Sequence, residues 1–151
     1  HILIYPTSGY DTLNDVAKSF PDAHFIVYGS GRDDREGNLQ FRLPSRDGFL
    51  EDLLAAKAVM ATAGFTLISE SLYLGKPYLA LPIKGQFEQQ LNAWQLEQSG
   101  FGAAAGSDLH ASVAQFLETL PAIAERVAGA PRNDGSALRS KVLELIDQYS
   151  T

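Results

Sequence analysis

Short unbroken apolar runs alternate along this chain with segments in which apolar residues recur every three or four positions. The first run is Ile2–Tyr5, which the turn Pro6–Gly9 closes, and the segment Asp11–Phe20 with helical spacing follows it. An unbroken run of this length is typical of a buried strand, and the spacing of the second segment is typical of an amphipathic helix. The chain therefore opens as a strand followed by a helix.

The same alternation continues along the rest of the chain. Further strands are expected at His24–Tyr28, Leu39–Arg42, Ala58–Ala63, Tyr78–Ile83 and Phe101–Ala105. Further helices are expected at about Asp47–Ala56, Phe65–Leu74, Gln86–Gln98, Ser112–Leu120, Pro121–Ala128 and Gly135–Gln148. Strands that are apolar throughout, separated by amphipathic helices, indicate a parallel sheet covered on both faces. The sequence thus predicts a doubly wound, Rossmann-like α/β domain.

Several segments carry more specific expectations. The charged stretch Arg32–Gly37 is predicted to be a loop, and Ser45 is placed to cap the helix that follows it. The stretch Ala128–Pro131 is the one expected break, before a C-terminal helix. The side chains expected to pack inward from the helices at 47–56 and 86–98 are Phe49, Leu50, Leu53, Leu54, Leu91, Trp94 and Leu96.

Composition limits the function further. The chain has 151 residues, 45% of them hydrophobic, and 12 basic against 18 acidic side chains give a net charge of -6. No apolar run approaches the 18 or so residues of a membrane-spanning helix, and no cluster of Lys and Arg points to nucleic acid. The absence of cysteine excludes a disulfide framework and a thiolate nucleophile. It fits a reducing compartment, so we expect a cytoplasmic location.

The start of the chain also carries an expectation. The only methionine is Met60, and His1 leads directly into the first strand without a starting methionine or a signal peptide. We therefore expect residues 1–151 to be a single domain of a longer protein.

In an open α/β sheet, ligands bind where the strands end and the helices begin. The turn Thr7, Ser8 and Gly9 offers hydroxyl groups and a glycine there, although an ordinary turn has the same composition. The turn Gly29–Gly31 begins like a dinucleotide-binding fingerprint but has Asp34 in place of the third glycine. It also follows the second strand rather than the first, so it does not predict NAD binding.

The turn at Gly64 lies between a predicted strand and a predicted helix. The helix begins with Phe65 and Thr66 and has no acidic residue in its first turn. Its first N–H groups are therefore free to donate hydrogen bonds to a phosphate. Glu70 lies about 9 Å further along the helix axis, roughly the reach from a diphosphate to the ribose of the same nucleotide. The alternative is a solvated glutamate on an exposed helix side.

Hydrogen-bonding side chains are dense in the stretch Lys84–Asn92, at the start of the next helix. Carboxylates and amides of this kind recognise sugar hydroxyls, although an amide-rich helix face is the alternative. Lys84 either offsets phosphate charge or is simply exposed. A sugar nucleotide is the ligand that these features would share.

The order of features within Met60–Gly102 forms a specific composite. It runs through Gly64, Glu70, Gly75-Lys76-Pro77, Leu81-Pro82, Glu88-Gln89 and Asn92-Ala93. In this composite the chain resembles the donor-binding half of GT-B glycosyltransferases, and within that fold the MurG-like and UDP-glucuronosyltransferase-like enzymes. The rest of the predicted α/β order is compatible with one half of a GT-B fold.

The resemblance implies a role for each matching position. The turn at Gly64 holds the nucleotide diphosphate through backbone N–H groups, Glu70 binds the ribose hydroxyls, and the pair at 88–89 holds the donor sugar. The base falls near Leu43–Phe49 and is read mainly by backbone groups. The residues expected to bind substrate are Thr7, Ser8, Gly9, Gly64, Phe65, Thr66, Glu70, Lys84, Glu88 and Gln89.

One position departs from the pattern. Thr62 stands where many relatives place a His or Arg near the diphosphate. Stabilisation of the leaving group would then rely more on helix N–H groups, with Thr66 or Lys84 as further candidates.

The resemblance implies the donor domain of an inverting, metal-independent glycosyltransferase that uses a UDP-sugar as co-substrate and no cofactor. The acceptor site and the general base would lie in an N-terminal domain absent from this chain. The 151-residue chain has three histidines, His1, His24 and His110, and none of them falls in the candidate site. We therefore assign no catalytic residue and no metal ligand to this chain. Isolated, the domain should bind a donor without transferring its sugar.

Two other functions stay open. One is a half-domain of a UDP-GlcNAc 2-epimerase, and the other is a non-catalytic scaffold or partner domain derived from the GT-B fold. The expected partners are the sugar nucleotide and the missing N-terminal domain, with no nucleic acid. The resemblance also leaves room for peripheral membrane association of the full-length protein through that other domain.

Overall fold

The structure, a computed structural model, describes residues 1–131, 140–141 and 143–144. Its elements are, in chain order, β1 (Ile2–Tyr5), α1 (Tyr10–Lys18), β2 (Phe25–Tyr28), β3 (Arg35–Glu36), β4 (Leu39–Arg42), α2 (Arg46–Ala55), β5 (Ala58–Thr62), α3 (Phe65–Tyr73), β6 (Tyr78–Leu81), α4 (Phe87–Ser99), β7 (Gly102–Ala104) and α5 (Leu109–Gly129). The helix expected at 135–148 falls mostly outside the described residues.

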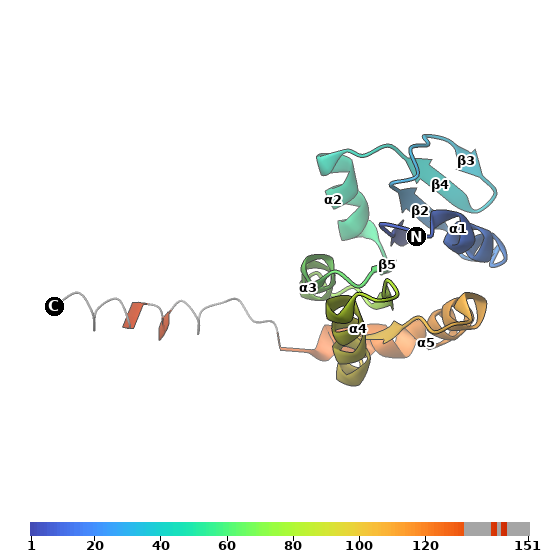
Figure 1. The fold of residues 1–151 in the computed structure, drawn as a ribbon. Coiled ribbons are helices and arrows are strands. Elements are labelled where there is room, and N and C mark those ends of the chain that lie inside the picture. The colour runs from blue at the N-terminus through green and yellow to red at the C-terminus, as the bar shows by residue number, and fades with distance from the viewer. Residues whose placement is uncertain (132–139, 142, 145–151) are drawn as a thin grey trace.

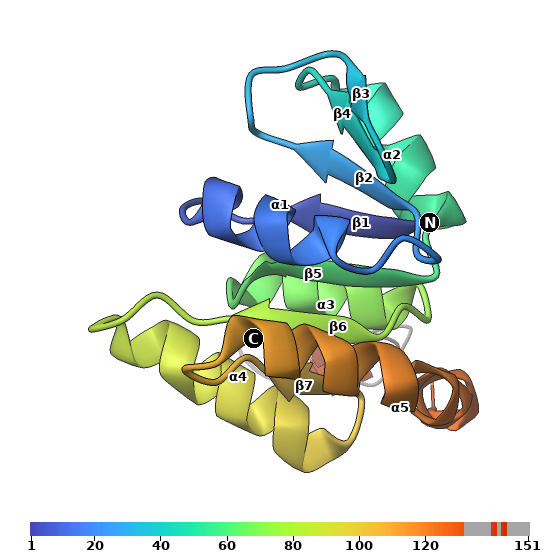
Figure 2. The same ribbon diagram turned by 90° about the vertical axis from the view of Figure 1, so that its right-hand side faces the viewer.

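One sheet organises the described part of the chain. Its order is β3-β4-β2-β1-β5-β6-β7, from the top to the bottom of Figure 2, and only the pair β3–β4 is antiparallel. The chain moves outward from β1 through β2 to β4 and then returns to place β5 on the other side of β1. The doubly wound, Rossmann-like fold is therefore confirmed, with its topological switch point between β1 and β5.

Five of the strands, β1, β2, β5, β6 and β7, consist almost entirely of apolar residues because helices cover both faces of the sheet. Ile4 and Met60 face the cluster that α1 and α5 complete, whereas Leu3 and Val59 face the cluster under α2, α3 and α4. In Figure 1, α1 lies on one side of the strands and α2 and α3 on the other. No helix of the described residues is long and apolar enough to cross a membrane.

The two helices expected at 112–120 and 121–128 are one continuous helix, so that prediction was wrong. Pro121 lies inside α5 and on its exposed side. A proline there removes one backbone hydrogen bond, a cost of about 3 kcal/mol. Phe116, Ile123 and Val127 lie on the same buried side of α5, on both sides of the proline, and their common packing keeps the helix continuous.

The charged stretch at 32–37 was predicted to be a loop, but it contains strand β3. Arg35 and Glu36 pair with β4 in a hairpin at the edge of the sheet. Exposed charged side chains are usual on an edge strand, because they discourage pairing with another chain. An exposed edge strand therefore lacks the apolar pattern by which the other strands were found.

The inward faces of two helices were partly mispredicted. In α2, Leu50 and Leu54 are 50% and 51% exposed, whereas Asp52 is 7% exposed. In α4, Leu91 and Trp94 are 40% and 57% exposed, although Leu96 is buried as expected. The carboxylate of Asp52 can be buried only because partners satisfy it, and those partners lie in strands β2 and β4, outside α2.

Candidate functional site

The loops that follow β1 and β5 meet at the switch point of the sheet. The hydroxyl group of Thr7 donates to the hydroxyl oxygen of Thr62, with 3.4 Å between the two oxygens. Ser8 and Gly9 are exposed beside this contact, and Gly9 precedes α1 in the left-handed conformation. The structure thus brings together the two turns that were singled out as ligand-binding, at the carboxyl edge of the sheet.

The β5–α3 turn presents three N–H groups at the start of α3. The N–H of Gly64 donates to the carbonyl oxygen of Thr62 at 2.8 Å, so it is not directed outward. The N–H groups of residues 65, 66 and 67 have no partner among the described residues, and no side chain caps the helix. With no acidic residue in the first turn, this helix start can accept an anion.

Gly64 leaves open space in front of this helix start. Its φ of -74° and ψ of 129° are available to any residue. A Cβ atom built at Gly64 would meet nothing within 4 Å. The glycine is therefore not required by the backbone or by packing, and its small size instead lets a ligand approach the N–H groups closely.

Two buried or half-buried side chains hold the turn from the protein side. The phenol of Tyr78 donates to the carbonyl oxygen of Thr62 at 2.7 Å, and the amide of Asn92 donates to that of Ala63 at 3.0 Å. Burial raises the pKa of the Tyr78 phenol. Sequence reasoning treated Tyr78 only as part of an apolar strand; a single phenol within such a run was the available signal.

Glu70 is exposed on α3, and its carboxylate makes no hydrogen bond or ion pair with any described residue. The preceding residue, Ser69, lies toward α4, where it lines a cavity with Asn92. Each helical residue is rotated by about 100° from the one before it, so Glu70 does not share the direction of Ser69. Its exposed carboxylate is free to accept hydrogen bonds from a ligand.

The β6–α4 loop and the first turn of α4 carry the remaining predicted residues. The side-chain oxygen of Gln89 accepts from the N–H of Ile83 at 3.0 Å, and its amide donates to Gln86 at 2.8 Å. Lys84 is exposed on this loop, and Glu88 is exposed in the first turn of α4. Gln89 thus holds the loop that presents Lys84, and sugar binding by Lys84, Glu88 and Gln89 stays a prediction.

A cavity of about 350 Å³ opens at the carboxyl ends of β1, β2 and β4. Phe49 forms part of its wall, with its ring 5.1 Å from that of Tyr5 and 5.2 Å from that of Tyr28. The cavity borders the stretch at 43–49 where a base was expected. Its lining residues are Tyr5, Tyr28, Gly29, Pro44, Ser45, Arg46 and Phe49.

A buried carboxylate supports the aromatic wall of this cavity. Asp52 accepts from the phenol of Tyr28 at 2.7 Å and pairs with the guanidinium of Arg42 at 3.2 Å. Burial, together with Asp52, raises the pKa of Tyr28 to about 12. Sequence reasoning missed Tyr5, Tyr28 and Asp52, because the strands that bring them together are far apart in the chain.

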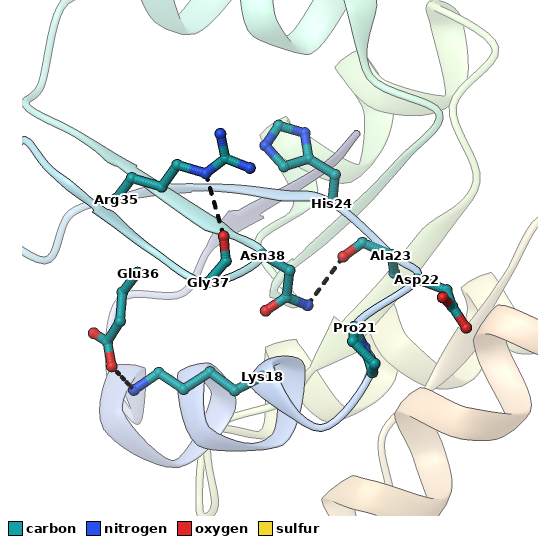
Figure 3. Close-up of a pocket in the computed structure, with 9 residues that line it drawn as sticks. All are labelled: Lys18, Pro21, Asp22, Ala23, His24, Arg35, Glu36, Gly37 and Asn38. Carbon is teal, nitrogen blue, oxygen red and sulfur yellow. Dashed lines mark hydrogen bonds and ion pairs between the residues drawn. The ribbon is translucent and has the colours of Figure 1, made fainter.

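A larger cavity, of about 610 Å³, lies at the opposite edge of the sheet (Figure 3). Several of its polar groups are already engaged: Lys18 pairs with Glu36 at 2.6 Å, and the amide of Asn38 donates to three backbone carbonyls. Burial, the charged N-terminus and Arg35 lower the pKa of His24 at its rim. Lys18, Glu36 and Asn38 are thus engaged in holding the β3–β4 hairpin against α1 and the loop that follows it, and we assign no ligand to this cavity.

The other two histidines also have structural contacts. The ring of His1 makes a hydrogen bond of 2.9 Å with the backbone oxygen of Asp52, and the ring of His110 stacks on Phe20. Neither lines the aromatic cavity. Within the residues that the structure describes, no three His, Asp or Glu side chains gather as a metal site would require.

A family model described as glycosyl transferase family 1 matches residues 1–121. No curated protein matches the chain. Solved structures match it as a fold, and the chain spans less than half the length of those described below. The glycotransferase of kitacinnamycin is 22% identical, with 97% of this chain and 42% of that chain covered and a TM-score of 0.67.

Two further structures show the range of these neighbours. The glycosyltransferase SnogD from Streptomyces nogalater is 17% identical, with 92% and 42% of the two chains covered and a TM-score of 0.56. The UDP-GlcNAc 2-epimerase from Neisseria meningitidis, bound to UDP-GlcNAc, is 18% identical, with 95% and 43% covered and a TM-score of 0.65. The shared fold is a Rossmann-like half of the GT-B architecture.

Proposed function

The chain belongs to glycosyl transferase family 1, and from this membership we propose that it binds a nucleotide-diphosphate sugar, in particular a UDP-sugar, as the donor domain of a glycosyltransferase. The enzyme would be inverting and metal-independent. The acceptor and the general base would lie in a second domain.

The arrangement of one edge of the sheet carries this proposal. The free N–H groups at residues 65–67 can take a diphosphate, and the cavity beside Phe49 can take a flat base. Glu70, exposed on α3, would bind the ribose that joins them. One ligand with an anionic, a polar and an aromatic part matches all three features.

The chemistry follows from charge. As the bond between the sugar carbon and the diphosphate oxygen breaks, its electron pair goes to the diphosphate, whose negative charge grows. The fixed N–H groups at residues 65–67 would stabilise that charge in the transition state. An acceptor hydroxyl would attack the same carbon from the opposite side and lose its proton to a base outside this chain.

Calorimetric titration of the 151-residue chain with UDP, UDP-GlcNAc and UDP-glucose tests the proposal. We expect saturable binding, weakened about ten-fold by Glu70→Ala because the ribose loses a charge-assisted hydrogen bond. Glu125→Ala, which removes an exposed carboxylate on α5, is the matched control and should leave binding unchanged. No binding by any nucleotide would contradict a donor site and favour a scaffold or partner role.

An epimerase is the second candidate, because UDP-GlcNAc 2-epimerases match the fold with TM-scores of 0.64 and 0.65. The two functions differ in their need for an acceptor. With UDP-GlcNAc alone, an epimerase forms the 2-epimer, which NMR detects, whereas a transferase leaves the sugar configuration unchanged. We expect the second result from a protein that contains this chain and its second domain; formation of the 2-epimer would reverse the assignment.

A further inference from the structure

The β5–α3 turn has an unusual support, a phenol that is fully buried below it. Tyr78 is 0% exposed and stands in β6 among the apolar side chains that lie under α2, α3 and α4. Its hydroxyl group has one polar partner among the described residues, the carbonyl oxygen of Thr62 at 2.7 Å. A buried hydroxyl group costs free energy unless it is bonded, so this contact fixes where that carbonyl points.

The same carbonyl organises the rest of the turn. The oxygen of Thr62 also accepts from the N–H of Gly64 at 2.8 Å, while Asn92 holds the oxygen of Ala63 at 3.0 Å. The peptide group between Ala63 and Gly64 is therefore held at both its oxygen and its N–H. Both carbonyl oxygens of the turn point into the protein, and the N–H groups of α3 face outward.

This orientation matters because the turn has no charged side chain of its own. Thr62, Ala63, Gly64, Phe65 and Thr66 are all neutral. Attraction for an anion there comes from oriented N–H groups alone. A carbonyl oxygen that turned outward would place a partial negative charge against the anion and cancel much of that attraction.

The backbone at Tyr78 is fixed as well. Tyr78 pairs with Gly102 of β7, and a Cβ atom at Gly102 would collide with the carbonyl oxygen of Tyr78. The strand that carries the phenol therefore has little freedom to shift.

We propose that Tyr78 is a positioning residue for the diphosphate of the donor, acting through the carbonyl oxygen of Thr62, an inference that rests on the proposed donor-binding function. The phenol does not touch the ligand. It keeps the carbonyl group of Thr62 directed inward, while Asn92 holds that of Ala63, so that the N–H groups of α3 form the anion site.

Tyr78→Phe tests this, because it removes the hydroxyl group and keeps the ring. Binding of UDP and of uridine is followed by NMR titration, with the amide signals of residues 65 and 66 as reporters. We expect the affinity for UDP to fall about ten-fold and that for uridine to change less than about two-fold. An unchanged affinity for UDP, or an equal loss for both ligands, would overturn the proposal.

Asn38→Ala is the matched control, because it also removes a donor to backbone carbonyls but at the opposite edge of the sheet. It should leave the ratio of the two affinities unchanged. If Tyr78→Phe does not fold, Asn92→Ala releases the neighbouring carbonyl and should give the same selective loss for UDP; an equal loss for both ligands overturns the proposal again. Wild-type protein that binds no nucleotide refutes the donor-binding function itself, whereas wild-type binding with an unchanged ratio in the variants refutes only the role of Tyr78.

Discussion

At the carboxyl edge of the sheet, one half of the candidate site consists of side chains and the other consists mainly of backbone N–H groups. On the side of β4, β2 and β1, aromatic side chains form a cavity, and the buried carboxylate of Asp52 supports its wall. On the side of β5 and β6, the backbone N–H groups of α3 face outward and the nearby side chains of the turn are small or neutral. The first half suits the uncharged, flat part of a nucleotide, and the second suits its anionic part.

The difference has consequences for how each half tolerates substitution. A site made of side chains depends on the residues that hold those side chains, so distant changes in α2 should weaken it. A site made of backbone depends on peptide orientation and on open space, so most side chains on its surface can change without effect. Substitutions should therefore separate base binding from phosphate binding.

The largest effect is expected from Asp52→Ala, which should remove the support of the first half. It leaves the buried phenol of Tyr28 without its acceptor and Arg42 without its partner. Loss of one member of a buried hydrogen-bonded pair costs about 3 kcal/mol. Urea denaturation should show the free energy of unfolding lowered by about that amount.

Asp47→Ala is the control for this experiment, because Asp47 is an exposed carboxylate in the first turn of the same helix. Its loss should cost less than about 1 kcal/mol. If Asp52→Ala were as mild as Asp47→Ala, the carboxylate would not support the aromatic wall.

Phe49→Ala comes next, since it removes the wall itself. Phe49 is half-buried and contacts the rings of Tyr5 and Tyr28. The stability loss should be about 2 kcal/mol, below the 3–5 kcal/mol or so of a fully buried ring. Affinities for UDP and for uridine should fall together, because both ligands carry the base. A loss for UDP alone would contradict the assignment of the base to this cavity.

Sequence patterns located the turn and the helix start of the second half, whose role in binding stays a prediction, and largely missed the aromatic cavity of the first. The turn at Gly64 and the carboxylate of Glu70 lie in one continuous stretch, so their spacing could be interpreted directly. Tyr5, Tyr28 and Phe49 meet only because β1 pairs with β2 and α2 packs over both. A parallel sheet brings together residues from separate strands, and no local spacing encodes that contact.

Most of the fold was predicted because the pattern that marks a buried strand also lies in one continuous stretch of sequence. Strands buried on both faces are apolar almost throughout, and five of the seven strands, β1, β2, β5, β6 and β7, have this property in the sequence. The exceptions are elements decided by tertiary contacts: the charged edge strand β3, the helix α5 that continues through Pro121, and the burial of Asp52. Each follows from partners elsewhere in the chain.

Gly64→Ala addresses the second half directly. Its backbone angles suit alanine and a Cβ atom meets no neighbour, so the free energy of unfolding should change by less than about 1 kcal/mol. The new methyl group would occupy the space in front of the helix start. We expect the affinity for UDP to fall about ten-fold, or about 1.4 kcal/mol, with that for uridine unchanged, by the same NMR titration.

Gly37→Ala gives the opposite pattern and serves as its control. Gly37 has a φ of 61°, which costs a residue with a Cβ atom about 1–2 kcal/mol, and it lies in the β3–β4 hairpin away from the site. Stability should fall while affinity for UDP stays the same. If Gly64→Ala instead lost stability and kept its affinity, the open space at Gly64 would have no part in binding.

The smallest effect is expected from Thr62→Val, which removes a hydroxyl group at the centre of the edge while keeping the shape of the side chain. The bond from Thr7 to Thr62 is long, at 3.4 Å, so its loss should cost little stability. The backbone oxygen of Thr62 keeps its bond to Tyr78, which is the contact that orients the turn. Titration should therefore find the affinity for UDP within about two-fold of wild type. A loss as large as that of Gly64→Ala would mean that the hydroxyl group binds the phosphate itself, and the second half would then rely on a side chain as the first half does.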